Sequence, residues 1–154
     1  MNNHRFWGNH FQRDFIPNLR LLVDVLVERL LPVFDGIEKE ADAKSEEAWN
    51  RYMRESGDPD DDPSTFAEWA HEVGQSHYNA MVRMRQTLLN SHAVTMYHAW
   101  EQQLLSFHRR ELLHPGDEND NSLMNMKVIR KRLASEGVEV SDFASWGKID
   151  EMRL

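Results

Sequence analysis

The 154-residue chain contains no cysteine, and it has only seven glycines and five prolines. Without cysteine it can form no disulfide, no zinc–thiolate site, no iron–sulfur cluster and no thiol nucleophile. The scarcity of glycine and proline leaves few turns, which favours long helices over many short strands. The sequence also lacks a Gly-rich phosphate loop and any alternation of strands with helices, so we expect neither a Rossmann nor a P-loop nucleotide site.

Long apolar runs are missing as well. The longest apolar stretch covers residues 19–34 and is interrupted by four charged residues, so it predicts no membrane span. The N-terminal sequence MNNHRFWGNH has no apolar core of the kind found in signal peptides. We therefore expect a cytoplasmic protein that does not bind membranes.

Positive charge is the minority charge. The chain has 18 Lys and Arg against 26 Asp and Glu, a net charge of −8, and protonating its eight histidines would cancel that charge. This balance argues against a broad nucleic-acid-binding face, because such faces need clustered Lys and Arg. The sequence contains no DNA-binding motif, and RNA would bind only through a small basic cleft.

The hydrophobic pattern is helical over most of the chain. From Asp14 to Ile37, apolar residues recur at steps of three and four, and Pro32 is expected to kink or split this helix. Residues 1–13 show no clear period and are expected to be irregular. A polar continuation over 38–54 is expected to stay helical. The length fits one domain, which we assign to residues 1–154.

Two exposed loops are expected, at 56–64 and 115–121. Between them, Thr65 and Glu68 form a capping-box pattern that predicts a helix start, while Asn90-Ser91 is either a turn or part of a continuing helix. A further helix is expected over 123–135 and closed by Gly137, and a last one from 141–145 to the end. The pattern predicts an all-α fold, an antiparallel helical bundle of four to six helices.

Metal-ligand spacings are present, but the first of them does not face the apolar side of its helix. Glu-x-x-His occurs at Glu68–His71 and at Glu111–His114, which is the ligand pattern of di-iron carboxylate bundles. However, Glu68 lies about 200° round the helix from the apolar residue Phe66, at 100° per residue. We therefore predict no metal site and no cofactor.

Three polar residues fall on the apolar stripe of the segment before residue 114. Glu101, His108 and Glu111 lie within about 40° of the centre of that stripe, at 100° per residue. Polar groups in such places must be paired or must face a cavity. One interpretation is a buried polar network, with His108 paired to Glu101, to Glu111 or to an arginine of a neighbouring helix. The other is a functional cleft lined by titratable groups.

The same segment contains an Arg-x4-His pattern, Arg109 to His114. This pattern resembles the motif of HEPN proteins (higher eukaryote and prokaryote nucleotide-binding), which are small helical bundles. Many of them are metal-independent ribonucleases of toxin–antitoxin, CRISPR and anti-phage systems. The resemblance implies Arg109 and His114 as catalytic residues at a dimer cleft. Arg110 stands where the family usually has Asn, Asp or His. An imidazole can act as general base or acid, and a guanidinium can hold a phosphate.

Positive charge is concentrated in one helix. Lys127, Arg130, Lys131 and Arg132 occur with no acidic residue between Ser122 and Ser135, and Arg110 adds to this basic patch. The patch is either a solvated helix face or a contact surface for RNA or for the acidic loop of another chain.

Two functions remain open from the sequence. The first is a helical protein-interaction or assembly module without catalysis, which forms homo-oligomers or binds a protein partner. Its support is a first helix that is apolar nearly all round and a last helix that is still in apolar period at Leu154. The second is a HEPN-like ribonuclease, or a degenerate relative, in phage defence or a toxin–antitoxin system.

Overall fold

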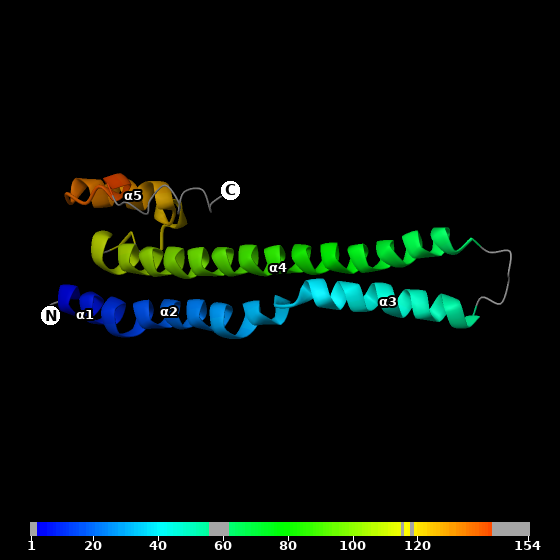
Figure 1. Cartoon of the computed structure of the whole chain (residues 1–154). Coiled ribbons are helices and arrows are strands. Elements are labelled where there is room, and N and C mark those ends of the chain that lie inside the picture. The colour runs from blue at the N-terminus through cyan, green and yellow to red at the C-terminus, as the bar shows by residue number, and fades with distance from the viewer. Residues whose placement is uncertain (1–2, 56–61, 115, 118, 143–154) are drawn as a thin grey trace. The chain divides into compact units, whose positions relative to one another are not determined.

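The computed structural model describes residues 3–55, 62–114, 116–117 and 119–142, and within these ranges it contains helices and no strand. The all-α expectation is confirmed. Contacts divide the chain into two compact units. Unit 1 comprises Met1–Val23 and Ser91–Leu154, and unit 2 comprises Asp24–Asn90. The α-helices are α1 (Asn3–His10), α2 (Ile16–Val25), α3 (Ile37–Glu55), α4 (Pro63–Phe107) and α5 (Met126–Ser135) (Figure 1). A single helical domain over 1–154 stays a prediction.

The N-terminal segment is helical, and our expectation of an irregular segment over 1–13 was wrong for residues 3–13. Helix α1 continues through a π-helical turn, Phe11–Phe15, directly into α2. The side chain of Trp7 is only 5% exposed and its ring lies 5.5 Å from that of Phe107. Tertiary packing of one large ring therefore supports a segment whose sequence lacks helical periodicity.

The break at Pro32 is confirmed. The helix becomes a π-helical turn at Leu26–Leu30 and a 3-10 turn at Leu31–Phe34, because Pro32 has no N–H to continue the α-helical pattern. Asp35 is extended, and Gly36 has a φ of +83°, which a residue with a side chain rarely adopts. Helix α3 then starts at Ile37 and covers the polar segment expected to be helical.

Helix α4 begins two residues earlier than expected and does not break. The Asp62 carboxylate accepts hydrogen bonds from the Ser64 N–H at 2.9 Å and from the Ser64 hydroxyl at 2.8 Å, and these bonds lower its pKa. The helix therefore starts at Pro63 rather than at Thr65, so the last two residues of the expected loop 56–64 are helical. Of the two alternatives at 90–91, the continuing helix is the one observed.

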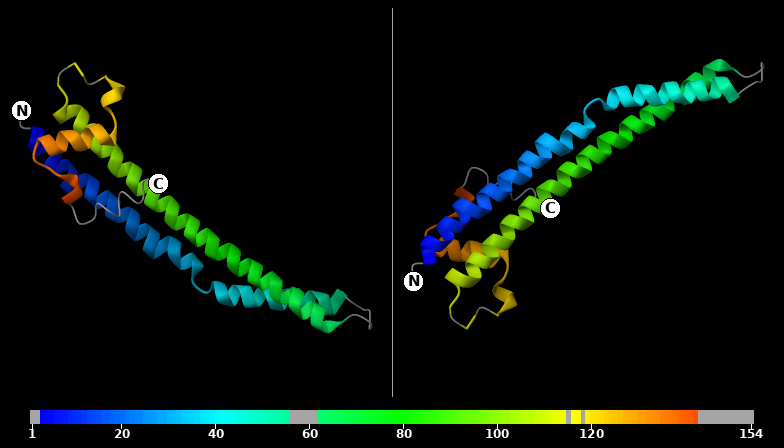
Figure 2. Two further views of the ribbon diagram at one scale, coloured as in Figure 1. Left: turned by 90° about the horizontal axis from the view of Figure 1, so that it is seen from above. Right: turned by 90° about the horizontal axis from the view of Figure 1, so that it is seen from below.

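Unit 2 is a helical hairpin in which α3 packs along the first part of α4 (Figures 1 and 2). Between α3 and α4 the fully buried residues are small: Ala41 and Ala48 on α3, and Ala70 and Gly74 on α4. Phe34, in the 3-10 turn before α3, is the large side chain that is fully buried in the described part of this unit. A Cβ built on Gly74 would overlap the side chain of Ser45 and lie 2.6 Å from the backbone oxygen of Ala41. The two backbones therefore approach each other closely at this point.

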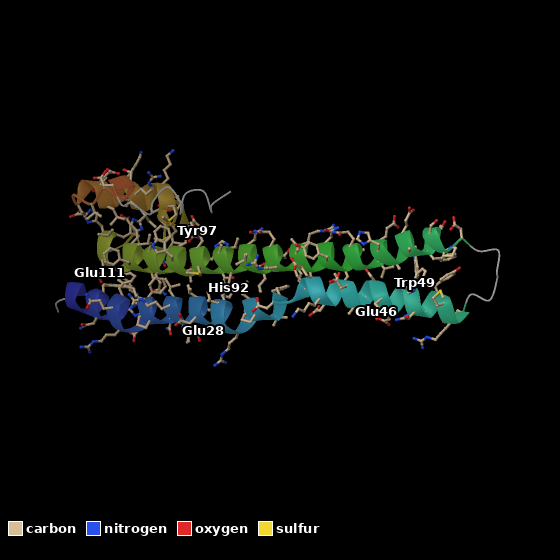
Figure 3. All side chains as sticks on the ribbon, in the orientation of Figure 1. Glu28, Glu46, Trp49, His92, Tyr97 and Glu111 are labelled. Carbon is tan, nitrogen blue, oxygen red and sulfur yellow. The ribbon has the colours of Figure 1, made fainter. Side chains whose placement is uncertain are left out.

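Unit 1 has the larger side chains in its core. Its buried residues come from α1 (Trp7), from α4 and the turn after it (Tyr97, His108), from α5 (Met126, Ile129) and from a 3-10 turn at Val140–Asp142 (Val140). His92 of α4 donates a 3.0 Å hydrogen bond from Nε2 to the Leu22 carbonyl of α2 (Figure 3). These residues and contacts involve α1, α2, α4 and α5.

Helix α5 has a defined cap at each end. The Asn125 side-chain oxygen accepts a 3.0 Å hydrogen bond from the Val128 N–H, and Gly137 has a φ of +83°. The N–H groups of Gly137 and Val138 bond back to Ala134 and Leu133, as in a Schellman ending. The predicted closure by Gly137 is confirmed, although α5 begins at Met126 rather than at 123.

Replacing Asn125 with alanine is expected to destabilise unit 1 by about 1 kcal/mol, because the Val128 N–H loses its acceptor at the first turn of α5. Replacing it with aspartate keeps an acceptor and should cost little. Urea unfolding followed by circular dichroism measures both. Equal loss in the two variants would show that the cap does not stabilise α5.

Two further expectations concern loops and the chain end. Residues 116, 117 and 119–121 are exposed, in agreement with the loop expected at 115–121. The last predicted helix lies almost wholly outside the described residues, as do residues 56–61, 115 and 118. No helix in the described part of the chain combines the length and the hydropathy of a membrane-spanning segment.

Candidate functional site

The Arg-x4-His pair lies at the end of α4. There the chain forms a π-helical turn over His108–Leu112, and Leu113 is extended. The side chains of Arg109 and His114 are both exposed, and within the described residues neither forms a hydrogen bond or an ion pair. Neither lines any of the three surface pockets described below. The structure thus presents both groups to solvent beside the same turn and does not place them in a common cavity.

The three polar residues of the predicted network have separate surroundings. Glu111 accepts a 2.7 Å hydrogen bond from the indole N–H of Trp7 (Figure 3). Glu101 lies 3.4 Å from the exposed His98, one turn earlier on α4. His108 is fully buried, and neither of its ring nitrogens has a hydrogen-bond partner. The expected pairing of His108 with Glu101 or Glu111 is therefore not formed.

His108 is the buried polar group that sequence reasoning placed correctly on the inward face. Burial lowers its pKa, and the positive charge of Arg132 on α5 lowers it further. Both effects favour the neutral imidazole, because a second positive charge would be desolvated and repelled. The two ring nitrogens also lose their hydrogen bonds to water on folding and gain none in return, which lowers the stability of the folded protein.

Unit 1 is expected to lose stability as the pH falls below about 6.5, the ordinary pKa of histidine. The folded pKa of His108 is the lower one, so the unfolded chain binds the extra proton first and stability decreases with falling pH. A His108→Phe substitution should raise stability by about 1–3 kcal/mol at neutral pH and by more at pH about 5.5.

Urea unfolding at two pH values checks this prediction, with His98→Phe as the control because the His98 side chain is 64% exposed. The His98 variant should keep the pH dependence of the wild type. If the stability of the His108→Phe protein falls with pH as much as that of the wild type, His108 is not the cause of the loss of stability at low pH.

The predicted basic patch lies mainly on α5. Lys127 and Lys131 are exposed, whereas Arg130 and Arg132 are half-buried. An open pocket of about 510 Å³ is lined by Lys127, Arg130, Lys131, Ala134 and Glu139. The five residues of the patch do not form one continuous surface. The charge of Arg132 lowers the pKa of the buried His108, and Arg110 lies on the π-helical turn after α4. The pocket therefore presents the part of the patch that is accessible to a partner.

A second surface feature, the unit 2 groove, was missed by sequence reasoning. Two pockets of about 260 and 430 Å³ share Asp42, Ser45 and His71, and together they form one groove between α3 and α4. Three carboxylates of α3 line it at intervals of four residues: Glu38, Asp42 and Glu46. Trp49 (Figure 3) and Tyr78 supply aromatic walls, and Ala67, Ala70 and Gly74 are the small residues contributed by α4. The four-residue spacing of the acids was the available signal.

Large apolar side chains are exposed on both units. In unit 2 they include Trp69 at 44% and Met84 at 59% exposure on α4. The full set in the described residues is Ile16, Leu21, Val23, Val27, Val33, Met53, Trp69, Val82, Met84, Val94 and Val138. The buried apolar residues are fewer, and three of these are alanines. Exposed apolar side chains that lie together on one face are typical of a surface that binds a protein.

Within the described residues, no group of three or more His, Asp and Glu side chains is arranged to hold a metal ion. The chain matches no protein-family model, and neither the curated proteins nor the solved structures include a significantly similar one. The resemblance to HEPN proteins thus stays a prediction.

Proposed function

We propose that this protein is a helical assembly module that self-associates and has no catalytic activity of its own. The observation that carries the proposal is the set of exposed large apolar side chains on a hairpin with a core of small residues. Two helices whose fully buried contact residues are this small gain stability from a further partner that covers the exposed apolar side chains, because burial of apolar area is the main driving force of folding.

The stripe on α4 of unit 2 is the best-defined contact surface. Trp69, Ala80 and Met84 are exposed and Val73 is half-buried, and all four fall within about 60° of one another at 100° per residue. Pairing two hairpins through such stripes gives four helices around one apolar core. Self-association of this kind would supply the antiparallel bundle of four to six helices expected from the sequence, in the cytoplasm where we place the protein.

Light scattering coupled to size exclusion tests the proposal. We expect the wild-type chain of 18.2 kDa to elute as a dimer or a larger assembly, with a dissociation constant below about 100 μM. A Trp69→Glu, Met84→Glu variant should dissociate at least about tenfold more readily, because it places two charges in the apolar contact.

The matched control is an Asn79→Glu, Gln86→Glu variant. These two exposed α4 residues lie on the side away from the stripe, so the control adds the same charge to the same helix without altering the stripe. It should assemble like the wild type. A wild-type protein that stays monomeric at concentrations above about 100 μM would contradict self-association.

A HEPN-like ribonuclease is the second candidate. It is favoured by the π-helical turn at His108–Leu112, which contains Arg109 and Arg110 and lies just before His114, since such turns are frequent at functional sites. If the protein cleaves RNA, His114→Ala should slow cleavage at least about 100-fold, whereas His98→Ala should not. Absence of RNA cleavage by the wild type would exclude Arg109 and His114 as catalytic residues. Equal cleavage by the two variants would exclude His114.

A further inference from the structure

We propose that the unit 2 groove of one copy binds the exposed basic face of α5 of a second copy. The basic face consists of Lys127, Lys131 and Ala134, with Arg130 beside them. This inference rests on the proposed self-association and deepens it, because it adds a charged contact between two copies to the apolar contact of the α4 stripes. The two surfaces belong to different units of the chain, so each copy has one of each kind to offer.

The groove carries negative charge that the described residues do not neutralise. Glu38, Asp42 and Glu46 follow one another at four-residue intervals, so they lie along one side of α3 about 6 Å apart. All three side chains are exposed, and none of them forms an ion pair within the described residues. Three unpaired carboxylates on one wall favour a partner with positive charges at the same interval.

The basic face of α5 has that interval. Lys127 and Lys131 are four residues apart, which also places them about 6 Å apart along their helix. Both are exposed, and neither forms an ion pair within the described residues. Their ammonium groups can therefore face two successive carboxylates of the groove, either Glu38 with Asp42 or Asp42 with Glu46.

The shapes of the two surfaces also suit each other. On α4 the groove is lined by small residues, Ala67, Ala70 and Gly74, which leave room for side chains that enter it. On α5, Ala134 follows Lys131 by three residues, so the next turn of the same face is small as well. The apolar stems of the two lysines can lie against Trp49 and Tyr78 while their charged ends reach the carboxylates.

Charge reversal tests the contact. The acid variant Asp42→Lys, Glu46→Lys makes the groove positive, and the basic variant Lys127→Glu, Lys131→Glu makes α5 negative. Each variant alone should weaken self-association at least about tenfold in sedimentation velocity, because like charges then face each other. Raising the ionic strength from about 0.05 to about 0.5 M should weaken the wild-type assembly in the same direction.

Mixing the two variants is the decisive step. The positive groove of the acid variant then meets the negative α5 of the basic variant, and the unchanged surfaces also match, so a mixed assembly should form where neither variant assembles alone. The matched control is Glu68→Lys, Glu72→Lys, which reverses two exposed acids with the same spacing on α4 outside the groove. It should behave like the wild type. Circular dichroism checks that each variant keeps its helix content.

The outcomes separate this inference from the proposed function. Wild-type assembly that neither reversal weakens would overturn the inference and leave self-association standing. Weakened assembly that mixing does not restore would also overturn it, because the contact would then lie within one chain or with another molecule. A wild-type chain that is monomeric would overturn both.

Discussion

Replacing Trp7 with alanine is expected to lower the free energy of unfolding of unit 1 by about 3–5 kcal/mol. The indole ring is 5% exposed and lies within 6 Å of the rings of His10, Phe11 and Phe107. It also donates the 2.7 Å hydrogen bond to Glu111. The substitution therefore leaves a cavity and removes the donor from a half-buried carboxylate. Because domains are stable by only about 5–15 kcal/mol, a loss of this size removes a large share of the stability of the unit.

A graded pair of variants separates the two contributions of Trp7. Trp7→Phe keeps an aromatic ring and loses the N–H, so it should cost about 1–2 kcal/mol. Glu111→Gln keeps an acceptor and should cost less. Urea unfolding monitored by circular dichroism gives all three values. Equal stability of the alanine and phenylalanine variants would show that ring packing contributes nothing.

Replacing Gly74 with valine is expected to destabilise unit 2 by about 3 kcal/mol, at the upper end of the range for overpacking. A Cβ at this position would lie 2.6 Å from the Ala41 carbonyl oxygen, which belongs to the backbone of α3 and cannot rotate away. The helices must separate, and the contacts of Ala48 and Ala70 are weakened with them. Gly74→Ala should cost less, since alanine's higher helix propensity offsets about 1 kcal/mol of the overlap.

Gly8 provides the matched control for this prediction. It lies in α1, where an added Cβ would meet nothing within 4 Å. Gly8→Ala should therefore stabilise the protein by up to about 1 kcal/mol through helix propensity alone. Thermal unfolding of both alanine variants should give shifts of opposite sign. A Gly74→Ala protein that gains stability would show that α3 and α4 are not in close contact at this point.

The sequence was most informative where a single residue determines the backbone. Pro32 cannot donate a hydrogen bond and Gly137 readily adopts positive φ, so both helix ends could be predicted from residue type. The continuation of α4 through Asn90 and Ser91 could not, because neither residue strongly favours a turn over a helix. Residues 3–13 were missed for a different reason: Trp7 stabilises them through contacts about 100 residues away in sequence.

The candidate surfaces were predicted less completely than the helices. The inward position of His108 follows from helical periodicity, but its lack of a partner depends on the packing of α5 against it. Glu38, Asp42 and Glu46 have the pattern of an ordinary solvated helix face. They line a groove because Gly74 and Ala70 let α4 approach α3, and that approach is a property of the pair of helices rather than of either sequence segment.

The small-residue packing of unit 2 has a consequence for the register of the hairpin. Ala41 and Ser45 on α3, like Ala70 and Gly74 on α4, repeat after one helical turn, so sliding one helix by about 5.4 Å would bring similar small surfaces together again. Two contacts oppose such sliding: the Tyr52 and Phe66 rings stack at 3.5 Å, and His77 lies 3.4 Å from Glu40 at the other end. Both contacts would be lost if one helix shifted by one turn. These four side chains therefore fix the register of α3 against α4.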